Sequence, residues 1–473
     1  MLFSSTFFLY VFLPIVLIIY YGLCKNQNTR NNVLLLFSLL FYAWGEPKFV
    51  LVMLVSILAN YYFGLLVDRT RHTPKVKLYL ITMVVFNLTI MGIFKYLGFL
   101  VQSINDISNL GLTVPQIALP IGISFFTFQS ISYVIDVYRG HGKVLKNPLD
   151  VGLYIAFFPQ LIAGPIVRYE TIAEEIHGRC ETEKDFADGI VRFIIGLSKK
   201  VLLSNQFALI ADKAYDLEGA GRLTVAFAWL GAISYMLQIY FDFGGYSDMA
   251  IGLGKMFGFH FNENFNFPYI AKSVSEFWRR WHISLSTWFR DYVYIPLGGN
   301  RVSKMKHLRN IFIVWLLTGI WHGANWTFIA WGVYFGIILI IEKFTGLGNF
   351  VSKSKVIGHI YTLFLVLISW VLFRANSIGD AVSYIGYMFG QHDAILMNDL
   401  TYLYLKENIY ILIIGILTCL PFSKLARNLF DKVNPMMQKA MKILAMLTLI
   451  LLFFVSVSYL VKGTYNPFIY FNF

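Results

Sequence analysis

Charged residues are scarce in this chain: Asp, Glu, Lys and Arg make up 14% of its 473 residues. Soluble globular domains carry roughly 25%, so a deficit over this length excludes a protein surrounded mainly by water. Hydrophobic residues take their place at 57% of the chain, and the mean hydropathy is +0.62. We therefore expect most of the surface to contact something other than water.

Cysteine is also rare, and the sequence has no soluble domain, internal repeat or low-complexity linker. The three cysteines, Cys24, Cys180 and Cys419, lack the spacing of a metal site. We assign them no chemistry and expect no bound metal. The chain is expected to form a single membrane domain over residues 1–473.

Long apolar runs recur along the chain, for example at Phe7–Tyr21, Phe49–Val67, Leu78–Leu88 and Ile443–Val461. Because a membrane span needs about 20 mostly apolar residues, the sequence predicts roughly ten to twelve embedded segments, several too short or too polar to cross fully. The first run has no basic residue before it and no small-residue cleavage site after it. We interpret it as a retained helix. The fold class predicted is an all-α, polytopic multi-helix bundle.

The basic residues lie between the apolar runs, which explains the net charge of +13 without a nucleic-acid partner. One set of early loops contains nine of them: Lys25, Arg30, Arg69, Arg71, Lys75, Lys77, Arg139, Lys143 and Lys146. The alternate loops contain Lys48 alone. Because basic loops stay in the cytoplasm, we expect the N-terminus to be extracytoplasmic.

Residues 151–167 are apolar but contain Pro159, Gly164 and Pro165, and basic residues bracket them on both sides. A segment that enters and leaves on one face, packed inside the bundle, fits this pattern better than a crossing. Near the other end, a further basic loop precedes the run Ile443–Val461. If that run crosses outward, residues 462–473 form an extracytoplasmic tail.

Residues 275–291 are rich in Trp, Arg and His. Laid on a helix, four side chains share one face, namely Trp278, Trp281, Leu285 and Trp288. Arg279 and Arg290 lie on an adjacent side, with His282 at the border. An interfacial helix explains this arrangement, with tryptophans among the headgroups and arginines in water. Arginines on the cytoplasmic face would also suit a phosphate-rich carrier.

The stretch that ends in Trp321-His322-Gly323 follows a cytoplasmic basic cluster. Twelve steps from Asn310 place His322 roughly 18 Å along a helix, near the middle of the membrane, with Trp321, Trp326 and Ile320 around it. An ionisable residue at that depth is a functional candidate, and a neutral imidazole can accept a proton. Gly323 is expected to break the helix, which makes residues 310–341 a bent or paired half-helix arrangement.

Asp242 and Asp248 occur in the glycine-rich stretch 240–258. Glycines allow close packing of helices or close approach to a ligand. Two interpretations stay open. The carboxylates pair with arginines to hold helices together, or they line a tunnel or ligand site.

Together these stretches resemble the membrane-bound O-acyltransferase (MBOAT) family, in particular its alginate O-acetyltransferase branch. The resemblance runs over nearly the whole chain and rests on Phe41–Gly45, Leu119–Gln129, Phe158–Pro165, Phe241–Asp248, Phe277–His282 and Trp321–Gly323. It implies a bundle with re-entrant and interfacial helices that encloses a catalytic tunnel. His322 matches the family's membrane-embedded catalytic histidine, and His282 matches a second signature position on the cytoplasmic side.

The tail is similar to the F-x-Y-x-x-F acyl-transfer motif of the teichoic acid D-alanylation system, which carries it on a separate small subunit. Phe468, Tyr470 and Phe473 fill the motif positions. The resemblance implies that Tyr470 accepts the acyl group, on a motif fused here within residues 462–473. An interfacial aromatic anchor is the alternative.

The function expected from the resemblance is transfer of an acetyl group from cytoplasmic acetyl-CoA across a bacterial plasma membrane. Arg279 or Arg280 would lie near the donor phosphates, although the sequence shows no CoA fingerprint. The acceptor would be an extracellular or cell-wall polysaccharide, reached through an extracytoplasmic Ser-type, SGNH-like acetyltransferase. The alternatives are transfer of D-alanine, transfer to a lipid, and a non-enzymatic transporter, since buried Asp and His with broken helices also suit transport pathways.

Overall fold

A computed structural model describes residues 1–463 and 465–469, apart from the side chains of Lys424 and Leu425. The described residues form helices, turns and loops without a strand, which confirms the all-α prediction. They cluster into two compact units. Unit 1 is Met1–Phe193 with Tyr246–Asn262, and unit 2 is Ile194–Gly245 with Glu263–Phe473.

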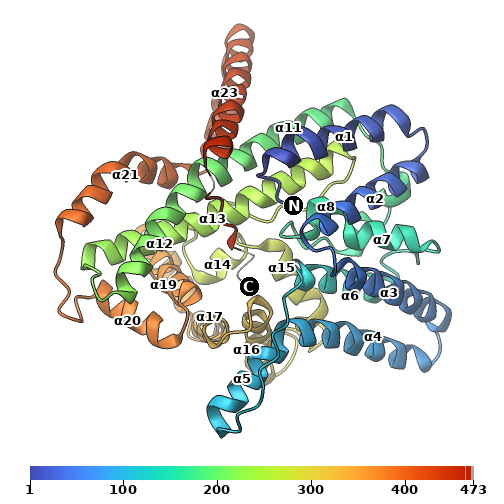
Figure 1. Ribbon diagram of the computed structural model, residues 1–473, viewed down its shortest axis with the longest axis horizontal. Helices are drawn as coiled ribbons and strands as arrows, with labels where there is room; N and C mark the ends of the chain where they lie inside the picture. Colours follow the sequence, from blue (N-terminus) through green and yellow to red (C-terminus); the bar gives the residue numbers. More distant parts are fainter. Residues whose placement is uncertain (464, 470–473) are drawn as a thin grey trace. The chain divides into compact units, whose positions relative to one another are not determined.

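Unit 1 begins with a continuous helix over the first apolar run, formed by η1, α1 and η2, as the sequence predicted. Its elements are η1 (Phe8–Phe12), α1 (Leu13–Ile18), η2 (Ile19–Leu23), α2 (Gln27–Gly45), α3 (Val50–Thr70), α4 (Lys75–Met91), η3 (Gly92–Tyr96), α5 (Leu97–Ser108), α6 (Ile123–Arg139), α7 (Pro148–Ala156), α8 (Phe158–Leu161), α9 (Tyr169–Ile172), α10 (Glu175–Gly178) and most of α11 (Glu183–Ser198). Helix α3 packs against both α4 and α6, and α2 packs against α7 (Figure 1).

Unit 2 holds most of α13 and the later helices. Its elements are η4 (Lys199–Ser204), α12 (Asn205–Gly219), α13 (Val225–Met256), η5 (Pro268–Ile270), α14 (Val274–Trp278), α15 (Ile283–Phe289), η6 (Arg290–Tyr294), α16 (Lys304–His322), α17 (Trp326–Phe344), α18 (Leu347–Ser352), α19 (Lys355–Arg374), α20 (Ile378–Met388), α21 (Asp399–Thr418), α22 (Phe422–Phe430) and α23 (Pro435–Lys462). Helices α16 and α17 pack closely together, and α17 also packs against α14 and α19.

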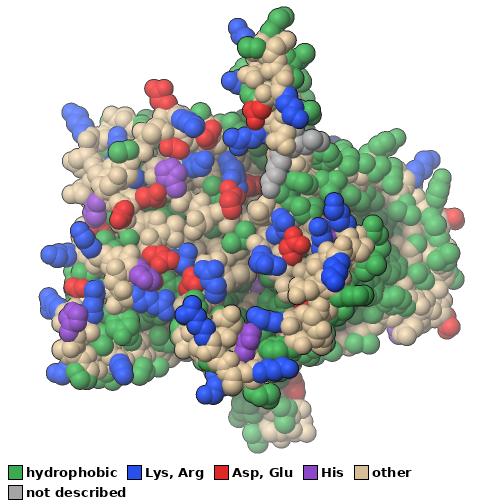
Figure 2. All heavy atoms as spheres, turned by 180° about the vertical axis from the view of Figure 1, so that it is seen from behind, with side chains coloured by type: hydrophobic (Ala, Val, Ile, Leu, Met, Phe, Trp, Pro, Cys, Tyr) green, Lys and Arg blue, Asp and Glu red, His purple; other side chains and the backbone are tan. Residues whose placement is uncertain are grey.

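Eight helical segments in the described part of the chain are long and apolar enough to cross a membrane. They are Val50–Thr70, Lys75–Ser108, Glu183–Gly219, Val225–Met256, Trp326–Phe344, Lys355–Arg374, Asp399–Thr418 and Pro435–Lys462. The helix Phe8–Leu23 is apolar but shorter. Hydrophobic side chains gather in broad areas of the face shown in Figure 2, as expected of a surface in contact with lipid. The protein is a multi-pass membrane protein.

The segment 151–167 is buried throughout, as the sequence predicted for a shielded, non-crossing stretch. It consists of the end of α7, the four-residue α8 and the loop that follows. The nine residues of α7 span about 14 Å, less than half of a hydrocarbon core of about 30 Å. The face at which the segment enters the membrane stays a prediction.

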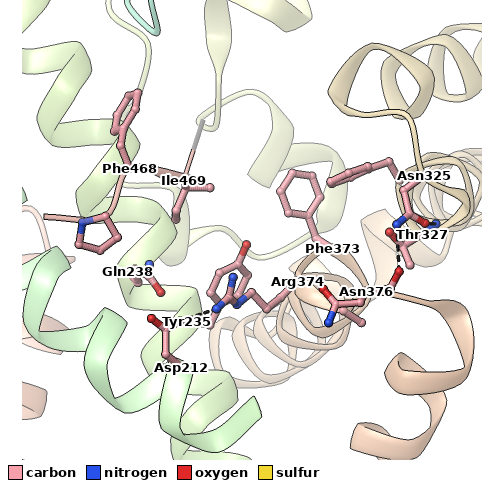
Figure 3. Close-up of a pocket in the computed structure, with 13 residues that line it drawn as sticks. Asp212, Tyr235, Gln238, Asn325, Thr327, Phe373, Arg374, Asn376, Phe468 and Ile469 are labelled. Carbon is pink, nitrogen blue, oxygen red and sulfur yellow. Dashed lines mark hydrogen bonds and ion pairs between the residues drawn. The ribbon is translucent and has the colours of Figure 1, made fainter. Parts of the chain in front are cut away.

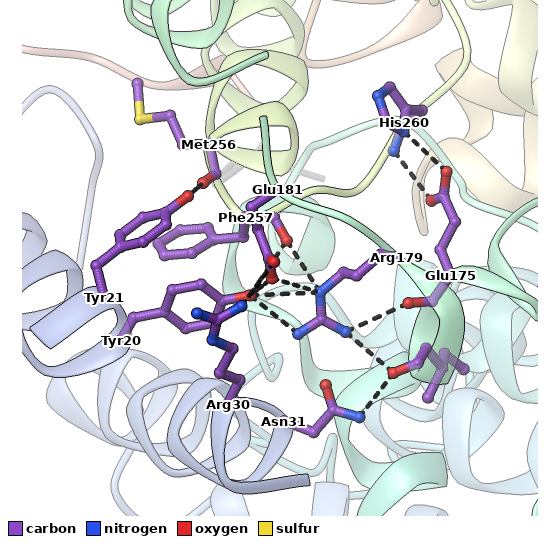
Figure 4. Close-up of polar contacts among 11 residues, drawn as sticks. Tyr20, Tyr21, Arg30, Asn31, Glu175, Arg179, Glu181, Met256, Phe257 and His260 are labelled. Atoms are coloured by element: carbon purple, nitrogen blue, oxygen red, sulfur yellow. Dashed lines mark hydrogen bonds and ion pairs between the residues drawn. The ribbon is translucent and has the colours of Figure 1, made fainter. Parts of the chain in front are cut away.

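Unit 1 contains a buried polar cluster around Arg179 (Figure 4). The Arg179 side chain is fully buried and donates hydrogen bonds to the carbonyl oxygens of Phe257 and Ile176, each at 3.0 Å. It also donates to the Tyr20 hydroxyl at 3.1 Å and lies 3.5 Å from a Glu181 oxygen. The cluster therefore joins the first apolar helix, the segment after α10 and the residues that follow α13.

Replacing Arg179 by Met is expected to lower the free energy of unfolding by about 3–5 kcal/mol. The change leaves buried acceptors without a donor and removes one of the two cations at Glu181; the other is Arg30, 2.7 Å away. Thermal unfolding of the detergent-solubilised protein measures the effect. Arg69→Met is the matched control, because Arg69 is exposed and should move the transition little. Equal transition temperatures in the two variants would contradict the assignment.

Candidate active site

The hairpin of α16 and α17 places His322. Helix α16 ends at His322, and Gly323 is extended with φ −170° and ψ 160°. Asn325 then caps α17 by accepting a hydrogen bond from the Thr327 amide at 3.0 Å. The predicted break at Gly323 and the paired helices are confirmed. A Cβ on Gly319 would lie 2.4 Å from the Phe328 carbonyl oxygen, so the close crossing of the two helices near His322 requires glycine.

Aromatic rings from three helices surround the His322 imidazole, which is 6% exposed. The ring centroids of Trp331, Trp321 and Phe373 lie 4.9, 5.0 and 5.3 Å from its own. Trp326, which was expected to help desolvate the imidazole, is instead 51% exposed. His322 lines a cavity of about 10 Å³ together with Phe243 and other aromatic residues, which is roughly the room that one water molecule needs.

The single helix expected over residues 275–291 is wrong. Helix α14 ends at Trp278, α15 begins at Ile283, and His282 between them has a left-handed backbone with φ 44°. A left-handed residue cannot continue a right-handed helix. The three tryptophans of the stretch are 3–6% exposed, and Trp278 and Trp281 belong to the hydrophobic core of unit 2. They are core residues rather than membrane-interface anchors.

His282 is 1% exposed and hydrogen-bonded to Asn264. Its Nδ1 lies 3.2 Å from Asn264 Oδ1, which also accepts from the Ser284 hydroxyl at 2.9 Å and from the Ser284 amide. Asn264 Oδ1 is thus an acceptor, so His282 Nδ1 carries the proton and Nε2 keeps its lone pair. Burial, together with the neighbouring His322, holds the pKa of His282 well below its usual range.

The two histidines share one aromatic cluster. The Trp321 ring lies 5.0 Å from the His322 ring and 6.0 Å from the His282 ring. Phe243 packs edge-on against His282 at 4.6 Å and also lines the cavity at His322. Two sequence-predicted site residues, 40 positions apart in the chain, are therefore brought to one place in unit 2.

The two predicted arginines have different surroundings. Arg279 is exposed and lines a cavity of about 220 Å³ with Arg290, Trp315 and Thr318. Arg280 instead forms an ion pair with Glu276 at 2.8 Å and donates to the Asn266 carbonyl oxygen. Thr318 is one helical turn before His322 on α16, so this cavity lies about 6 Å from His322 along the helix axis.

A second cavity, of about 400 Å³, also borders the aromatic cluster (Figure 3). Phe373 lines both this cavity and the small one at His322. Asn325, Thr327 and Arg374 contribute polar groups, and Arg374 forms an ion pair with Asp212. Pro467, Phe468 and Ile469 of the C-terminal tail form part of the wall. Tyr470 and Phe473 lie outside the described residues.

The glycine-rich stretch 240–258 holds helices together, as one of the two sequence interpretations proposed. Asp248 forms an ion pair with Arg192 at 2.7 Å. Asp242 pairs with a lysine rather than an arginine, because Lys200 Nζ lies 2.6 Å from its Oδ1. A Cβ on Gly252 would lie 2.6 Å from the Gly189 carbonyl oxygen, so α13 and α11 approach too closely for larger residues.

Several polar residues near the histidines and the tail were not identified from the sequence. Asn264 orients His282 from a loop without a regular pattern, and Lys200 is 2% exposed inside an apolar segment. A lysine within an apolar segment is a signal for function that would have singled out Lys200. Nothing local in the sequence distinguishes Asn264.

One group among the described residues has the geometry to hold a metal ion. Asp136, His141 and Glu170 of unit 1 offer ligand atoms within 4.8 Å of one another. Arg168 forms an ion pair with Glu170 and already supplies positive charge there. His141 Nδ1 lies 2.9 Å from Glu170. Ion pairs with Arg168 and His141 therefore hold Glu170 in this group.

Comparison with known proteins agrees with this arrangement. Residues 141–378 match the model of MBOAT, the membrane-bound O-acyltransferase family. The chain is 46% identical to a probable alginate O-acetylase of Pseudomonas syringae pv. tomato, over 83% of this chain and 76% of that protein. It is 41% identical to a probable alginate O-acetylase of Pseudomonas putida over the full length of both.

A peptidoglycan O-acetyltransferase of Helicobacter pylori is 36% identical over 82% of this chain and 80% of its own length. The family match covers the residues that carry both histidines, the aromatic cluster around them and the α16–α17 hairpin. Because the members of this family are acyltransferases, the match favours an enzyme over the alternative of a non-enzymatic transporter. The chain belongs to the membrane-bound O-acyltransferase family and is a multi-pass membrane acyltransferase.

Proposed function

We propose that the protein transfers an acetyl group from cytoplasmic acetyl-CoA, through an ester on Tyr470, for O-acetylation of an extracellular or cell-wall polysaccharide. One observation carries the proposal. Ile469, the residue before Tyr470, lies in the wall of a cavity that Phe373 also lines, and the Phe373 ring packs against His322. Phe373 thus links the cavity that the described part of the tail lines to the histidine.

The donor approaches from the cavity that Arg279 and Arg290 line. Both guanidinium groups are exposed, and arginine suits phosphate because its planar donors match phosphate oxygens. Helix α16 leads from this cavity to His322, so a thioester at the end of a long flexible arm can reach the imidazole. The Arg280 charge is compensated by Glu276 and the Arg290 charge by Asp291 at 2.7 Å, which makes Arg279 the strongest of the three candidates.

His322 acts as the general base for the first transfer. A free tyrosine has a pKa of about 10, so its hydroxyl needs a base to attack well at neutral pH. His322 accepts the Tyr470 proton while the phenol oxygen bonds to the thioester carbonyl carbon. The carbon–sulfur bond then breaks, and the imidazolium returns the proton to the departing CoA thiolate. The products are acetyl-Tyr470 and CoA.

His282 contributes a second, neutral imidazole to the same site. Asn264 holds its Nδ1 as a donor, so the lone pair on Nε2 is available to accept a hydrogen bond from the donor molecule. Both histidine rings pack against Trp321, with ring centroids 6.0 and 5.0 Å from its own.

The second transfer takes place outside the membrane. A phenyl ester is reactive because phenolate is a good leaving group, so a serine hydroxyl can take the acetyl group from Tyr470. The partner would be an extracytoplasmic SGNH-like acetyltransferase that passes the group to the polysaccharide. Two of the relatives are named as an alginate O-acetylase and a peptidoglycan O-acetyltransferase, and these names support a polysaccharide acceptor. The N-terminus and the tail are then extracytoplasmic, in a bacterial plasma membrane.

The test is to incubate the purified protein with radiolabelled acetyl-CoA and to locate the label by mass spectrometry. We expect hydroxylamine-sensitive acetate on Tyr470 and free CoA in equal amounts. A parallel incubation with a D-alanyl carrier protein distinguishes the acyl group. Loss of ester-linked acetate from the glycans of a deletion strain identifies the acceptor class. Labelling by D-alanine in place of acetate would overturn the proposed donor.

Replacing Arg279 and Arg290 together by Gln is expected to raise the KM for acetyl-CoA by at least about tenfold, because each lost phosphate contact weakens a charge-assisted hydrogen bond. The kcat should change little, since neither residue contacts the reacting atoms. S-acetylpantetheine, which lacks the nucleotide phosphates, should react equally with variant and wild type. Arg301→Gln is the matched control, from an exposed basic cluster. An unchanged KM would place the donor elsewhere.

A further inference from the structure

The last described residues of the chain rest against a buried ion pair. Lys200 and Asp242 are 2% and 1% exposed, and Lys200 Nζ lies 2.6 Å from Asp242 Oδ1. Lys200 comes from the π-helical element η4 and Asp242 from the middle of α13. A π-helical turn is an uncommon feature that often occurs at functional sites. The two helices thus present opposite charges at one point in unit 2.

Both members of the pair also bind the main chain of the tail. Lys200 Nζ donates to the Pro467 carbonyl oxygen, and Asp242 Oδ2 accepts from the Ile469 amide at 2.8 Å. Beside them, the Asn205 side-chain amide donates to Asn466 Oδ1 at 3.3 Å. Main-chain atoms of two residues just before Tyr470 are therefore held from both sides.

Stability alone is a weak reason for such a pair. Removing two charges from water costs free energy that their attraction only partly offsets, and buried pairs can often be replaced by apolar residues without loss of stability. Residues close to a chain terminus are often poorly ordered unless they are tied down, yet Phe468 and Ile469 are 4% and 6% exposed. What the pair supplies here is a fixed position for this segment.

We propose that Lys200 and Asp242 are positioning residues that clamp Pro467 and Ile469 in the wall of the cavity that Phe373 also lines. The proposal rests on the proposed function of Tyr470 as the acyl carrier. Their described contacts in the tail are with main-chain atoms of Pro467 and Ile469. Because the clamp holds main-chain atoms, it retains the tail equally before and after Tyr470 is acetylated.

The test uses the full-length protein with Lys200→Met and Asp242→Leu combined. Removing both charges avoids an unpaired buried ion, so the double variant is expected to fold. We expect the rate of Tyr470 acetylation to fall at least about tenfold, because two hydrogen bonds to charged groups are lost. The KM for acetyl-CoA should be unchanged. The control is Asp431→Leu with Lys432→Met, a pair of exposed residues.

Hydrogen exchange of the Ile469 amide provides a second readout, which does not depend on activity. In the wild type this amide should exchange much more slowly than in a free peptide, and the double variant should lose the protection. Wild-type protein in which Ile469 exchanges like a free peptide would overturn the clamp, even if the double variant fails to fold. Lys200→Arg, which keeps the charge, should retain most of the protection.

The two proposals fail in different ways. Wild-type protein that transfers acetate without an ester on Tyr470 would overturn the carrier function. Wild-type protein that forms the ester, together with a folded double variant that forms it at the same rate and keeps Ile469 protected, would overturn the clamp alone.

Discussion

His322→Ala is expected to lower the rate of acetyl transfer to Tyr470 by about 10²–10⁴-fold, the usual contribution of a general base. This corresponds to about 3–5.5 kcal/mol of transition-state stabilisation. The effect should appear in kcat, because the aromatic rings around the imidazole can still shape the site. Stopped incubations with radiolabelled acetyl-CoA measure the initial rate of ester formation.

His72→Ala is the matched control, because His72 is an exposed residue in the loop between α3 and α4. His322→Gln is a second test. It keeps a polar side chain of similar length but has no basic nitrogen, so it should be as impaired as the alanine variant. A glutamine variant with near wild-type kcat would show that His322 orients a group and does not accept the proton.

Tyr470→Phe is expected to abolish labelling of the tail completely, because the phenol oxygen that forms the ester is gone. Acetyl transfer to the polysaccharide in cells should disappear with it. The change deletes one oxygen atom and retains the aromatic ring, so packing of the tail should be little affected. Mass spectrometry of the C-terminal peptide and assay of ester-linked acetate on glycans report the two effects separately.

The control for the tail is Tyr459→Phe, which removes the hydroxyl of a half-exposed tyrosine near the end of α23. It should label like the wild type. Tyr470→Phe protein that still supported full glycan acetylation in cells would mean that the acetyl group crosses without this tyrosine, and His322 would then act directly on another acceptor.

The features that the sequence predicted correctly depend on local signals. Gly323 directly after His322 indicated a break, and the helices on either side of it confirm one. The glycines of 240–258 indicated close packing, and Gly252 lies against α11. In both cases the residue is glycine, whose missing side chain permits a helix break or a close helix contact. Such local effects can be predicted without knowledge of the rest of the chain.

For residues 275–291, the periodicity of the apolar side chains led to the wrong prediction of a single helix. The tryptophans of this stretch have helical spacing, but the backbone turns left-handed at His282. Trp278 and Trp281 both precede this turn, and they pack into one core with Trp331 and Trp370 from distant helices. Spacing of three and four is typical of a helix, but it does not require that the helix continue through every residue of the stretch.

The environment of the tail could not be predicted because its partners are far away in the sequence. Lys200 and Pro467 are 267 residues apart, and Asp242 and Ile469 are 227 apart. The tail sequence itself is equally compatible with an anchor in the headgroup region. Such long-range pairing depends on how whole helices assemble, which no local pattern encodes.

The tight aromatic packing around His322 also limits how much water can reach this residue. A space of about 10 Å³ has room for about one water molecule, so little water reaches the imidazole at this point. Exclusion of water from a site prevents the hydrolysis of reactive intermediates. In the proposed reaction, the rings around His322 would protect the acyl group from water until it reaches its acceptor.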